Sequence, residues 1–341
     1  YSYDAGDRLE VVVGPTGAVT RHTFDSLGLR RSTVDPDTGT VRYDYDAFGH
    51  IKSRQDAKGQ VTTYEYDLLG RIKRRSAGGN TSIEWEYDTA DKGIGRIRGV
   101  RDPNRFERKY FYDSYGRSQR TDVIIGTETF STTQEFDDYG RVRTTRYPAP
   151  GGSTVIENTF DSKGFFTRVT SENSQRVYWE ALDIDALGRV KRERYGNGLR
   201  TDSTYDEQTG LLRGVAVRSV GGSGILDLSM EYDDVGNVRR RQDKVDSLDE
   251  SYGYDALNRL TTYKPKTGAE QRFEYDAAGR AKYKADAGLF DYWTSPADGP
   301  WQPHHAVLRT RLGAAAESYA YDANGNMRTG GGRTFTSTAD N

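Results

Sequence analysis

The sequence predicts an all-β fold in which tandem β-hairpins form a long, curled antiparallel sheet that winds up around a space. A Tyr-Asp turn recurs along the chain, and large residues before each turn alternate with a period of two. Hydrophobic residues make up 34% of the chain and the mean hydropathy is −0.86, which leaves little material for a conventional core. The 24 tyrosines, the net charge of −2 and the regular spacing argue against disorder.

The repeat is measured by aspartates that follow an aromatic or apolar residue and open a turn. They are Asp4, Asp25, Asp46, Asp67, Asp88, Asp113, Asp137, Asp161, Asp185, Asp206, Asp233, Asp255, Asp276 and Asp322. Their steps are 21, 21, 21, 21, 25, 24, 24, 24, 21, 27, 22, 21 and 46 residues, so one unit near residue 299 has lost its signature. Such a period predicts an array of supersecondary units. We expect residues 1–341 to form a single array of about 14 repeats within a longer chain.

Each unit contains a turn with a clear chemical basis. In Asp67-Leu68-Leu69-Gly70 the carboxylate can accept a backbone N–H two residues on, and Gly supplies a positive φ. Other residue types would pay roughly 1–2 kcal/mol in that left-handed conformation, and Asn258 is the tolerated substitute. These features predict that the aspartates cap turns and do not act as acid–base pairs or calcium ligands.

The strands follow from the residues on either side of that turn. Tyr64 and Tyr66 are two apart and share one strand face, and an apolar residue such as Ile72 follows the turn. A second turn, "DPDTG" at 35–39 or "DAKG" at 56–59, closes the unit. Two strands of about seven residues and two turns of about four account for the 21-residue step. The tyrosine rings are expected to stack between units while their hydroxyls reach water.

The number of strands limits the shape of the sheet. Some 28 to 30 strands, about 4.8 Å apart, would form a sheet about 140 Å long, and open sheets of more than about ten strands curl. One full turn of that length would have a diameter of about 45 Å, which leaves a space inside.

The repeat-motif residues predicted to be structural sites share these turn and strand positions. They are Tyr45, Asp46, Gly49, Tyr66, Asp67, Gly70, Arg71, Tyr87, Asp88, Tyr112, Asp113, Gly116, Arg117, Phe136, Asp137, Gly140, Arg141, Asp185, Gly188, Arg189, Tyr232, Asp233, Gly236, Tyr254, Asp255, Tyr275, Asp276, Gly279, Arg280, Tyr321, Asp322 and Gly325.

The recurring Tyr-Asp-x-x-Gly-Arg, in forms such as "YDLLGRI", "YDSYGRS" and "YDAAGRA", resembles the YD repeat of the RHS-repeat family. That family includes bacterial Rhs polymorphic toxins, B and C subunits of insecticidal toxin complexes, wall-associated proteins and teneurins. The resemblance runs from Tyr1 to about Met327. It implies a sheet that spirals into a hollow shell, which in bacterial members encloses a C-terminal toxin domain.

The resemblance therefore predicts a structural shell segment that shields a toxin or effector polypeptide, exported by a dedicated secretion system of a bacterium and found outside the cell or on its surface. Its partners would be the enclosed polypeptide or the rest of the same shell. The alternative is an extracellular adhesion module that binds carbohydrate or a receptor through exposed aromatic residues. The family's Asp-Pro-x-Gly core motif and autoproteolytic segment do not occur in these residues, since the Asp-Pro pairs at 35–36 and 102–103 lie in early turns. We expect no enzymatic activity and no cofactor in this segment.

Other candidate sites have simpler interpretations. His304 and His305 are adjacent and lack a third ligand at metal-site spacing, so a solvated loop is expected and no metal site is predicted. The glycines of "GIGRIRG" at 93–99 open no helix, which argues against phosphate binding. Balanced charge argues against nucleic acid, and no apolar run is long enough to span a membrane.

The stretch 286–316 is where the period fails. It contains Trp293 and Trp301 among prolines. We expect a degenerate hairpin there, with an exposed recognition loop carrying the two tryptophans as the alternative.

Overall fold

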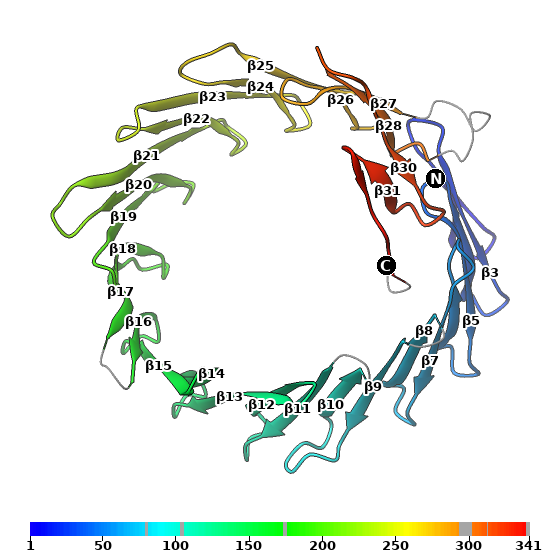
Figure 1. Cartoon of the computed structure of the whole chain (residues 1–341), viewed down its shortest axis with the longest axis horizontal. Coiled ribbons are helices and arrows are strands. Elements are labelled where there is room, and N and C mark those ends of the chain that lie inside the picture. Colours follow the sequence, from blue (N-terminus) through cyan, green and yellow to red (C-terminus); the bar gives the residue numbers. More distant parts are fainter. Residues whose placement is uncertain (79–80, 103–105, 173–175, 293–301, 312, 339–341) are drawn as a thin grey trace. The chain divides into compact units, whose positions relative to one another are not determined.

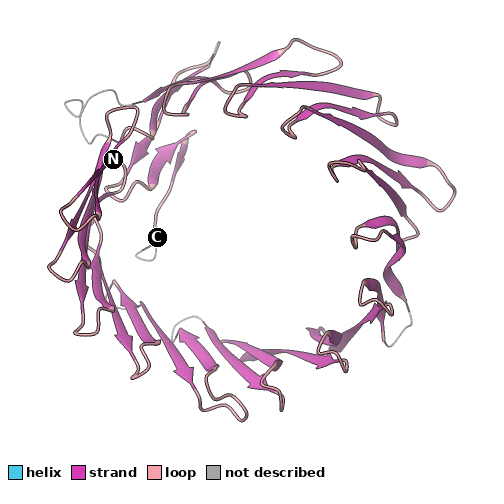
Figure 2. Ribbon diagram, turned by 180° about the vertical axis from the view of Figure 1, so that it is seen from behind, coloured by secondary structure: helices cyan, strands magenta, loops and turns pink. Residues whose placement is uncertain are grey.

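In the computed structural model, every described element is a β-strand, a turn or a loop (Figure 2). The structure describes all residues except 79–80, 103–105, 173–175, 293–301, 312 and 339–341. The strands are β1 (Ser2–Tyr3), β2 (Leu9–Val13), β3 (Val19–Phe24), β4 (Arg30–Asp35), β5 (Gly39–Tyr45), β6 (Ile51–Gln55), β7 (Val61–Tyr66), β8 (Ile72–Ala77), β9 (Thr81–Tyr87), β10 (Ile97–Asp102), β11 (Phe106–Tyr112), β12 (Ser118–Ile125), β13 (Glu128–Phe136), β14 (Val142–Ala149), β15 (Gly152–Phe160), β16 (Phe166–Ser171), β17 (Val177–Ile184), β18 (Val190–Tyr195), β19 (Arg200–Tyr205), β20 (Leu212–Arg218), β21 (Gly224–Tyr232), β22 (Val238–Asp243), β23 (Leu248–Tyr254), β24 (Leu260–Lys264), β25 (Gln271–Tyr275), β26 (Ala281–Lys284), β27 (Gly288–Tyr292), β28 (Ala306–Thr310), β29 (Glu317–Ser318), β30 (Ala320–Tyr321), β31 (Met327–Gly330) and β32 (Arg333–Thr334).

The hairpins use two classes of turn. A YD turn opens with one of the repeat aspartates, as between β7 and β8, where Tyr66 pairs with Ile72. A return turn joins one repeat to the next, as in residues 35–39 between β4 and β5. Because successive strands run antiparallel, the YD turns of each sheet lie at one end of its strands, and the return turns lie at the opposite end.

A register shift marks the strand residue just before the YD turn. It lies between Glu65 and Tyr66 in β7, and between Glu135 and Phe136 in β13. Such an irregularity bends a strand and increases its local right-handed twist. Each repeat therefore introduces a bend at the position of its motif aromatic residue.

Contacts divide the chain into two compact units. The first contains Tyr1–Glu86, Val100–Phe106 and Arg272–Asn341. Within it, β1 to β9 pair in sequence order, β25 to β29 form a second antiparallel series, and β30 to β32 form a small three-stranded sheet.

The second unit contains Tyr87–Gly99 and Glu107–Gln271. Its strands from β11 to β24 pair each with the next in antiparallel register, and β12 to β23 follow one another along a curved path (Figure 1). The predicted all-β class, built from hairpins in a curled antiparallel sheet, is confirmed. β27 pairs with β28 in antiparallel register, and much of the stretch predicted to be a degenerate hairpin lies outside the described residues.

The buried interior is small. Among the described residues, the buried hydrophobic side chains are Ala18, Val41, Ala77, Ala90 and Val155. The chain exposes 21632 Å², whereas a compact protein of 38.3 kDa would expose about 14,000 Å². Contacts between neighbouring hairpins must therefore supply much of the stability that a thick core supplies elsewhere.

Candidate functional site: a clamp between successive repeats

The YD turn is held by the carboxylate that opens it. In the turn of Asp137, Oδ1 accepts the backbone N–H groups of Tyr139 at 3.0 Å and Arg141 at 2.9 Å. The Gly140 N–H donates to the Asp137 carbonyl, and Gly140 has a φ of +80°. The second carboxylate oxygen, Oδ2, accepts Arg141 Nε at 2.7 Å. One aspartate thus fixes both the turn and the arginine that follows it.

These hydrogen bonds also fix the ionisation of the turn carboxylates. Burial opposes the charged form of Asp137, but hydrogen bonds from the backbone and guanidinium of Arg141 hold its pKa below the ordinary value. The Arg8 guanidinium is the largest influence that lowers the pKa of Asp4. Asp137 and Asp4 are therefore fixed anions at neutral pH and are poorly suited to transfer protons.

The arginine of one YD turn reaches the motif aromatic residue of the next repeat. The Arg141 guanidinium carbon lies 4.2 Å from the ring centroid of Phe160, and that of Arg117 lies 4.1 Å from the ring centroid of Phe136. We call this arrangement of aspartate, arginine and next-repeat aromatic ring the inter-repeat clamp. Further examples are Asp4, Arg8 and Phe24; Asp185, Arg189 and Tyr205; and Asp276, Arg280 and Tyr292.

The clamp tolerates other residues in the arginine position. His50 Nδ1 lies 3.0 Å from Asp46 Oδ2, and its ring stacks on Tyr66 with centroids 4.7 Å apart. Asn237 donates to Asp233 Oδ2 at 2.9 Å and to the side chain of Asn258, in the next YD turn, at 3.0 Å. A planar polar group that binds the aspartate and extends to the next repeat is the shared feature.

The motif tyrosines add a hydrogen bond in the opposite direction along the chain. The Tyr66 hydroxyl donates to the Ile51 carbonyl at 2.9 Å, and the Tyr45 hydroxyl donates to the Arg30 carbonyl at 2.7 Å. Burial raises the pKa of both hydroxyls. The same contact occurs at Tyr112, Tyr205, Tyr232 and Tyr254. Sequence reasoning did not predict this contact, in which the strand after the preceding YD turn offers a carbonyl within reach.

Two YD turns depart from the common form. Asp88 itself has a φ of +67° and opens a longer turn, in which its N–H donates to the Arg96 carbonyl and its Oδ1 accepts from Gly95. The glycines of "GIGRIRG" begin in this turn and not at a helix. Asp206 accepts from Thr209 and from the Arg213 guanidinium, whose nearest contact with it is 2.6 Å. Both turns still close a hairpin with the carboxylate.

The remaining predicted motif residues occupy the same places in their own turns. Positive φ values occur at Gly49, Gly70, Gly116, Gly188, Gly236, Gly279 and Gly325, and at Asn258. The turn aspartates Asp46, Asp67, Asp113, Asp255, Asp276 and Asp322 accept backbone N–H groups. Trp293 and Trp301 lie outside the described residues.

A second cluster lies entirely within the first unit, between segments about 265 residues apart. We call it the seam. The His304 backbone N–H donates to Asp37 Oδ1 at 2.9 Å, and its ring Nδ1 lies 2.5 Å from Asp37 Oδ2. Gln302 donates to the carbonyls of Asp37 at 3.0 Å and Asp322 at 2.9 Å. His304 is exposed in a turn, and Asp37 in a return turn binds this segment. His305 stacks on Tyr321 with centroids 4.3 Å apart.

The YD turn of Asp322 completes the seam. Asn324 donates to Asp56 Oδ2 at 2.7 Å and accepts the Lys58 N–H at 3.2 Å, while Lys58 Nζ lies 3.1 Å from Asp322 Oδ2. Burial opposes the charge of Asp322, but hydrogen bonds, including those from Asn326 and Lys58, lower its pKa to about 2.

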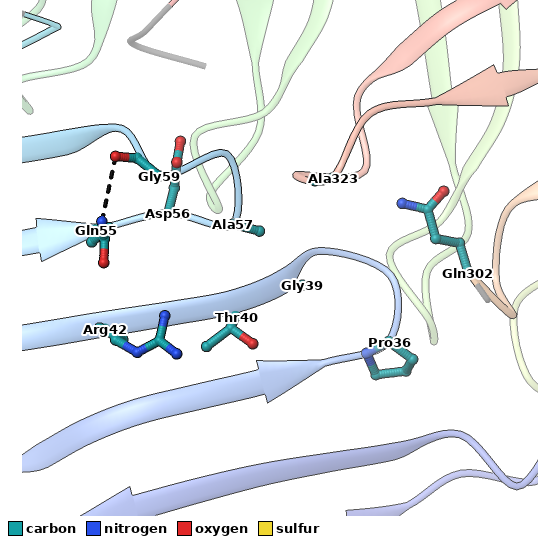
Figure 3. A pocket seen from close by; sticks show the side chains of 10 residues that line it. All are labelled: Pro36, Gly39, Thr40, Arg42, Gln55, Asp56, Ala57, Gly59, Gln302 and Ala323. Carbon is teal, nitrogen blue, oxygen red and sulfur yellow. Dashed lines mark hydrogen bonds between the residues drawn. The ribbon is translucent and has the colours of Figure 1, made fainter. Parts of the chain in front are cut away.

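A cavity of about 540 Å³ adjoins the seam, and Ala323 lies beside the turns that carry Gly39 and Ala57 (Figure 3). A Cβ at Gly39 would lie 2.4 Å from the Ala57 Cβ and 2.8 Å from the Ala323 carbonyl oxygen. The three turns are therefore in close contact at this point.

Within the described residues, no three His, Cys, Asp or Glu side chains form a group that could hold a metal ion. The same residues include no helix with the length and apolar character to cross a membrane. The clamp recurs along the chain and the seam brings distant segments together, and both join one hairpin to another.

Reasoning from the sequence did not identify the arginine contacts or the seam. The signal for the arginine was available, because Arg71, Arg117, Arg141, Arg189 and Arg280 each follow a glycine at one fixed offset from an aspartate. The seam had no such signal, because its partners are far apart in sequence.

Two protein-family models match this architecture. The RHS repeat model matches residues 24–60 and 45–81, and the teneurin YD-shell model matches residues 100–286, more than half of the chain. Toxin subunit YenC2 of Yersinia entomophaga is 30% identical over 157 residues, which cover 41% of this chain and 16% of that protein.

Solved structures show the same fold at lower identity. The Tc holotoxin pore of Photorhabdus luminescens aligns with a TM-score of 0.65 at 16% identity, over 91% of this chain and 20% of that one. The TcdB2–TccC3 crystal structure aligns with a TM-score of 0.61 at 18% identity, over 91% of this chain and 18% of that one. With its clamped Tyr-Asp hairpins and the YD-shell match over more than half its length, the chain belongs to the RHS/YD-repeat family.

Proposed function

We propose that this chain is a segment of a protein wall that encloses and shields a toxin or effector polypeptide until it is delivered. The observation that carries the proposal is the inter-repeat clamp, which joins hairpins into a thin sheet with few buried hydrophobic side chains. A sheet held together at its turns can separate two spaces without a thick core. The toxin-complex relatives support this use of the fold.

The wall has no chemistry of its own in this proposal. The Asp137 carboxylate is committed to backbone and arginine contacts, and its lowered pKa suits permanent charge. The partners are the enclosed polypeptide and further YD repeats. The proposed location is extracellular, after export from a bacterium.

The carbohydrate- or receptor-binding alternative receives no support from the relatives, whose names are those of toxin components. Glycan contact was predicted for exposed aromatic residues, and Trp293 and Trp301 lie outside the described residues. A glycan array with the purified chain tests this alternative directly.

Small-angle X-ray scattering of the purified chain tests the wall. We expect a radius of gyration well above the value for a compact protein of equal length, which is about 20 Å. A radius near that value, with the distance distribution of a solid globule, would contradict the proposal. The control is the clamp variant Arg141→Ala. Its unfolding is followed by circular dichroism, so that an increase in the radius of gyration caused by unfolding is recognised.

A further inference from the structure

A hollow of about 570 Å³ lies within the second unit, where β22, β23 and β24 lie side by side (Figure 1). Three of its lining residues are direct cross-strand partners, because Arg240 pairs with Ser251 and Ser251 pairs with Lys264. A short hydroxyl side chain therefore lies between two long cationic side chains on one face of the sheet. Lys266, two residues after Lys264, also lines the hollow. We call the site formed by these four residues the cationic hollow.

Two carboxylates line the same hollow, and the arginines of β22 pair with both. Asp249 accepts Arg240 Nε at 2.9 Å and Nη2 at 2.7 Å. Glu231 accepts Arg239 Nη2 at 3.0 Å. The four cationic and two anionic side chains of the lining leave an excess of two positive charges, which is carried by the two lysines.

Several donors of the hollow have no protein partner. Among the residues that the structure describes, neither lysine ammonium has a hydrogen bond or an ion pair, and the Ser251 hydroxyl has no hydrogen bond. Arg240 Nη1 lies 3.8 Å from Glu231 Oε1, which is beyond hydrogen-bond distance. The Arg240 hydrogen bond is the largest influence that lowers the pKa of Asp249, and the charge of Lys266 lowers it further, so this ammonium acts on the hollow.

Two other cross-strand rows show how this chain neutralises charge on a sheet face. Glu180 is directly opposite both Arg168 and Arg194, at 3.6 Å and 2.6 Å between charged atoms. Arg74 lies in the same way between two glutamates. In the cationic hollow, the place of the central carboxylate is taken by Ser251, so the cations on either side share no counter-charge between them.

The spacing of the row fits a tetrahedral oxyanion. Adjacent strands lie about 4.8 Å apart, so the Cα atoms of Arg240 and Lys264 are about 10 Å apart with Ser251 between them. Both long side chains can lean over the serine and donate to one anion together with its hydroxyl. Phosphate and sulfate present oxygens in several directions, as donors from three strands require, whereas a carboxylate presents two oxygens in one plane.

We propose that the cationic hollow is a binding site for a phosphate or sulfate group. The lysines supply the charge, and Ser251 and Arg240 Nη1 supply further donors. The inference goes beyond the proposed wall function and does not depend on it, because three neighbouring strands and the loop after β24 provide every residue of the site. The scattering test can therefore fail while this one succeeds, and the reverse.

Isothermal titration calorimetry of the purified chain tests the proposal, in chloride buffer at constant ionic strength. Inorganic phosphate, inorganic sulfate and glycerol 2-phosphate are titrated separately. The test variant carries Lys264→Gln and Lys266→Gln. The control carries Lys163→Gln and Lys191→Gln, which remove the same charge from exposed positions elsewhere in the second unit. Circular dichroism verifies that all three proteins fold alike.

We expect one phosphate or sulfate to bind per chain, with affinity weakened about tenfold or more in the test variant and unchanged in the control. Binding of glycerol 2-phosphate as tight as that of phosphate supports a site for an ester carried by a larger molecule, whereas its exclusion supports a site for the free ion. If neither phosphate nor sulfate binds saturably, the proposal is overturned. Equal weakening in the test variant and the control also overturns it, since attraction to net charge would then explain the binding.

Ser251→Glu provides a second, independent measurement. The added carboxylate would lie between Arg240 and Lys264 and take the place of the anion. We expect this variant to melt at a higher temperature than the unaltered chain in chloride buffer and to gain less from added phosphate. Phosphate also stabilises proteins by exclusion from their surface, and the comparison between the two proteins removes that effect. A variant that melts no higher and gains as much from phosphate as the unaltered chain overturns the proposal.

Discussion

Tyr66 has contacts with the preceding repeat through both its ring and its hydroxyl. The ring stacks on His50, and the hydroxyl donates to the Ile51 carbonyl at 2.9 Å. The sequence predicted the ring packing from the period of two. It could not predict the hydroxyl contact, because which carbonyl lies above the ring depends on the register of the neighbouring strand.

We expect Tyr66→Phe to lower the free energy of unfolding by about 1 kcal/mol, because it removes one intramolecular hydrogen bond from a partly buried position. Urea unfolding followed by circular dichroism measures the change. Tyr115→Phe is the control, since the Tyr115 side chain is 79% exposed. Equal effects of the two substitutions would show that the hydroxyl contact with Ile51 adds no stability.

The glycine of the YD turn gives a second prediction for a single residue. Gly140 has a φ of +80°, and an added Cβ would lie 3.3 Å from Arg117 Nη1. We expect Gly140→Ala to destabilise the protein by about 1 kcal/mol or more. Gly140→Asn should cost less, because Asn258 adopts a φ of +59° at the equivalent position. Thermal melting of both variants provides the comparison, and an alanine variant as stable as the asparagine variant would contradict the backbone explanation.

At the scale of the element, the turns share one response to acid. The folded pKa of carboxylates such as Asp67, Asp113 and Asp137 is lowered, so each stabilises the fold at pH values above its unfolded pKa. That stability is lost as the pH falls through the lowered folded pKa. Between about pH 5 and 8 these groups should contribute no slope.

We therefore expect thermal stability to fall as the pH is lowered from about 4 to 2. Asp137→Asn should melt at a lower temperature than the unaltered chain at neutral pH, because the asparagine cannot pair as an anion with Arg141. The two proteins should converge in strongly acidic solution, where Asp137 is protonated. Melting curves that stay separated by the same amount across this range would show that the charge of Asp137 is not what stabilises the turn.

The seam gives a prediction about how two elements dock. Asn324→Asp places a second carboxylate beside Asp56, so the turn between β30 and β31 should separate from the turn between β6 and β7. Hydrogen exchange followed by mass spectrometry should show faster exchange in residues 56–59. Gln208→Glu is the control, since it makes the same chemical change at the tip of another YD turn. If residues 56–59 exchange at the same rate in both variants, Asn324 does not hold the seam.

The elements of this protein were predictable because each is specified locally. The aspartate and glycine of the YD turn, and the aromatic alternation before it, all lie within one repeat, as in residues 64–70. The seam was not predictable, because Asp37 and His304 are 267 residues apart and only the folded chain brings them together. Metal-ligand spacing was the only pattern that the adjacent histidines offered, and their contact with Asp37 follows from a different cause.

For the whole molecule, the clamp makes stability a sum over neighbouring repeats. Deleting residues 117–140 would join Gly116 to Arg141 and remove one step of 24 residues. Arg141 would then follow Asp113 at the usual offset and still face Phe160, so a clamp should form again. We expect this variant to fold with a cooperative melting transition.

Circular dichroism and melting check this expectation. Deleting only residues 117–128 is the matched control, because it removes about half a repeat and leaves a strand that must run in the wrong direction. The interpretation of the clamp as a module boundary would be wrong if both deletions folded equally well or if neither folded.

The repetition of the clamp at successive junctions affects how the gene for such a chain can change over generations. Every junction uses the same aspartate and, at many junctions, the same arginine, so unequal crossing-over between two repeats restores a working junction at the breakpoint. Genes of this kind can gain or lose whole hairpins in one event without a second compensating mutation. The length of the array can therefore follow the size of whatever the protein must accommodate, while the sequence of each junction stays as it was.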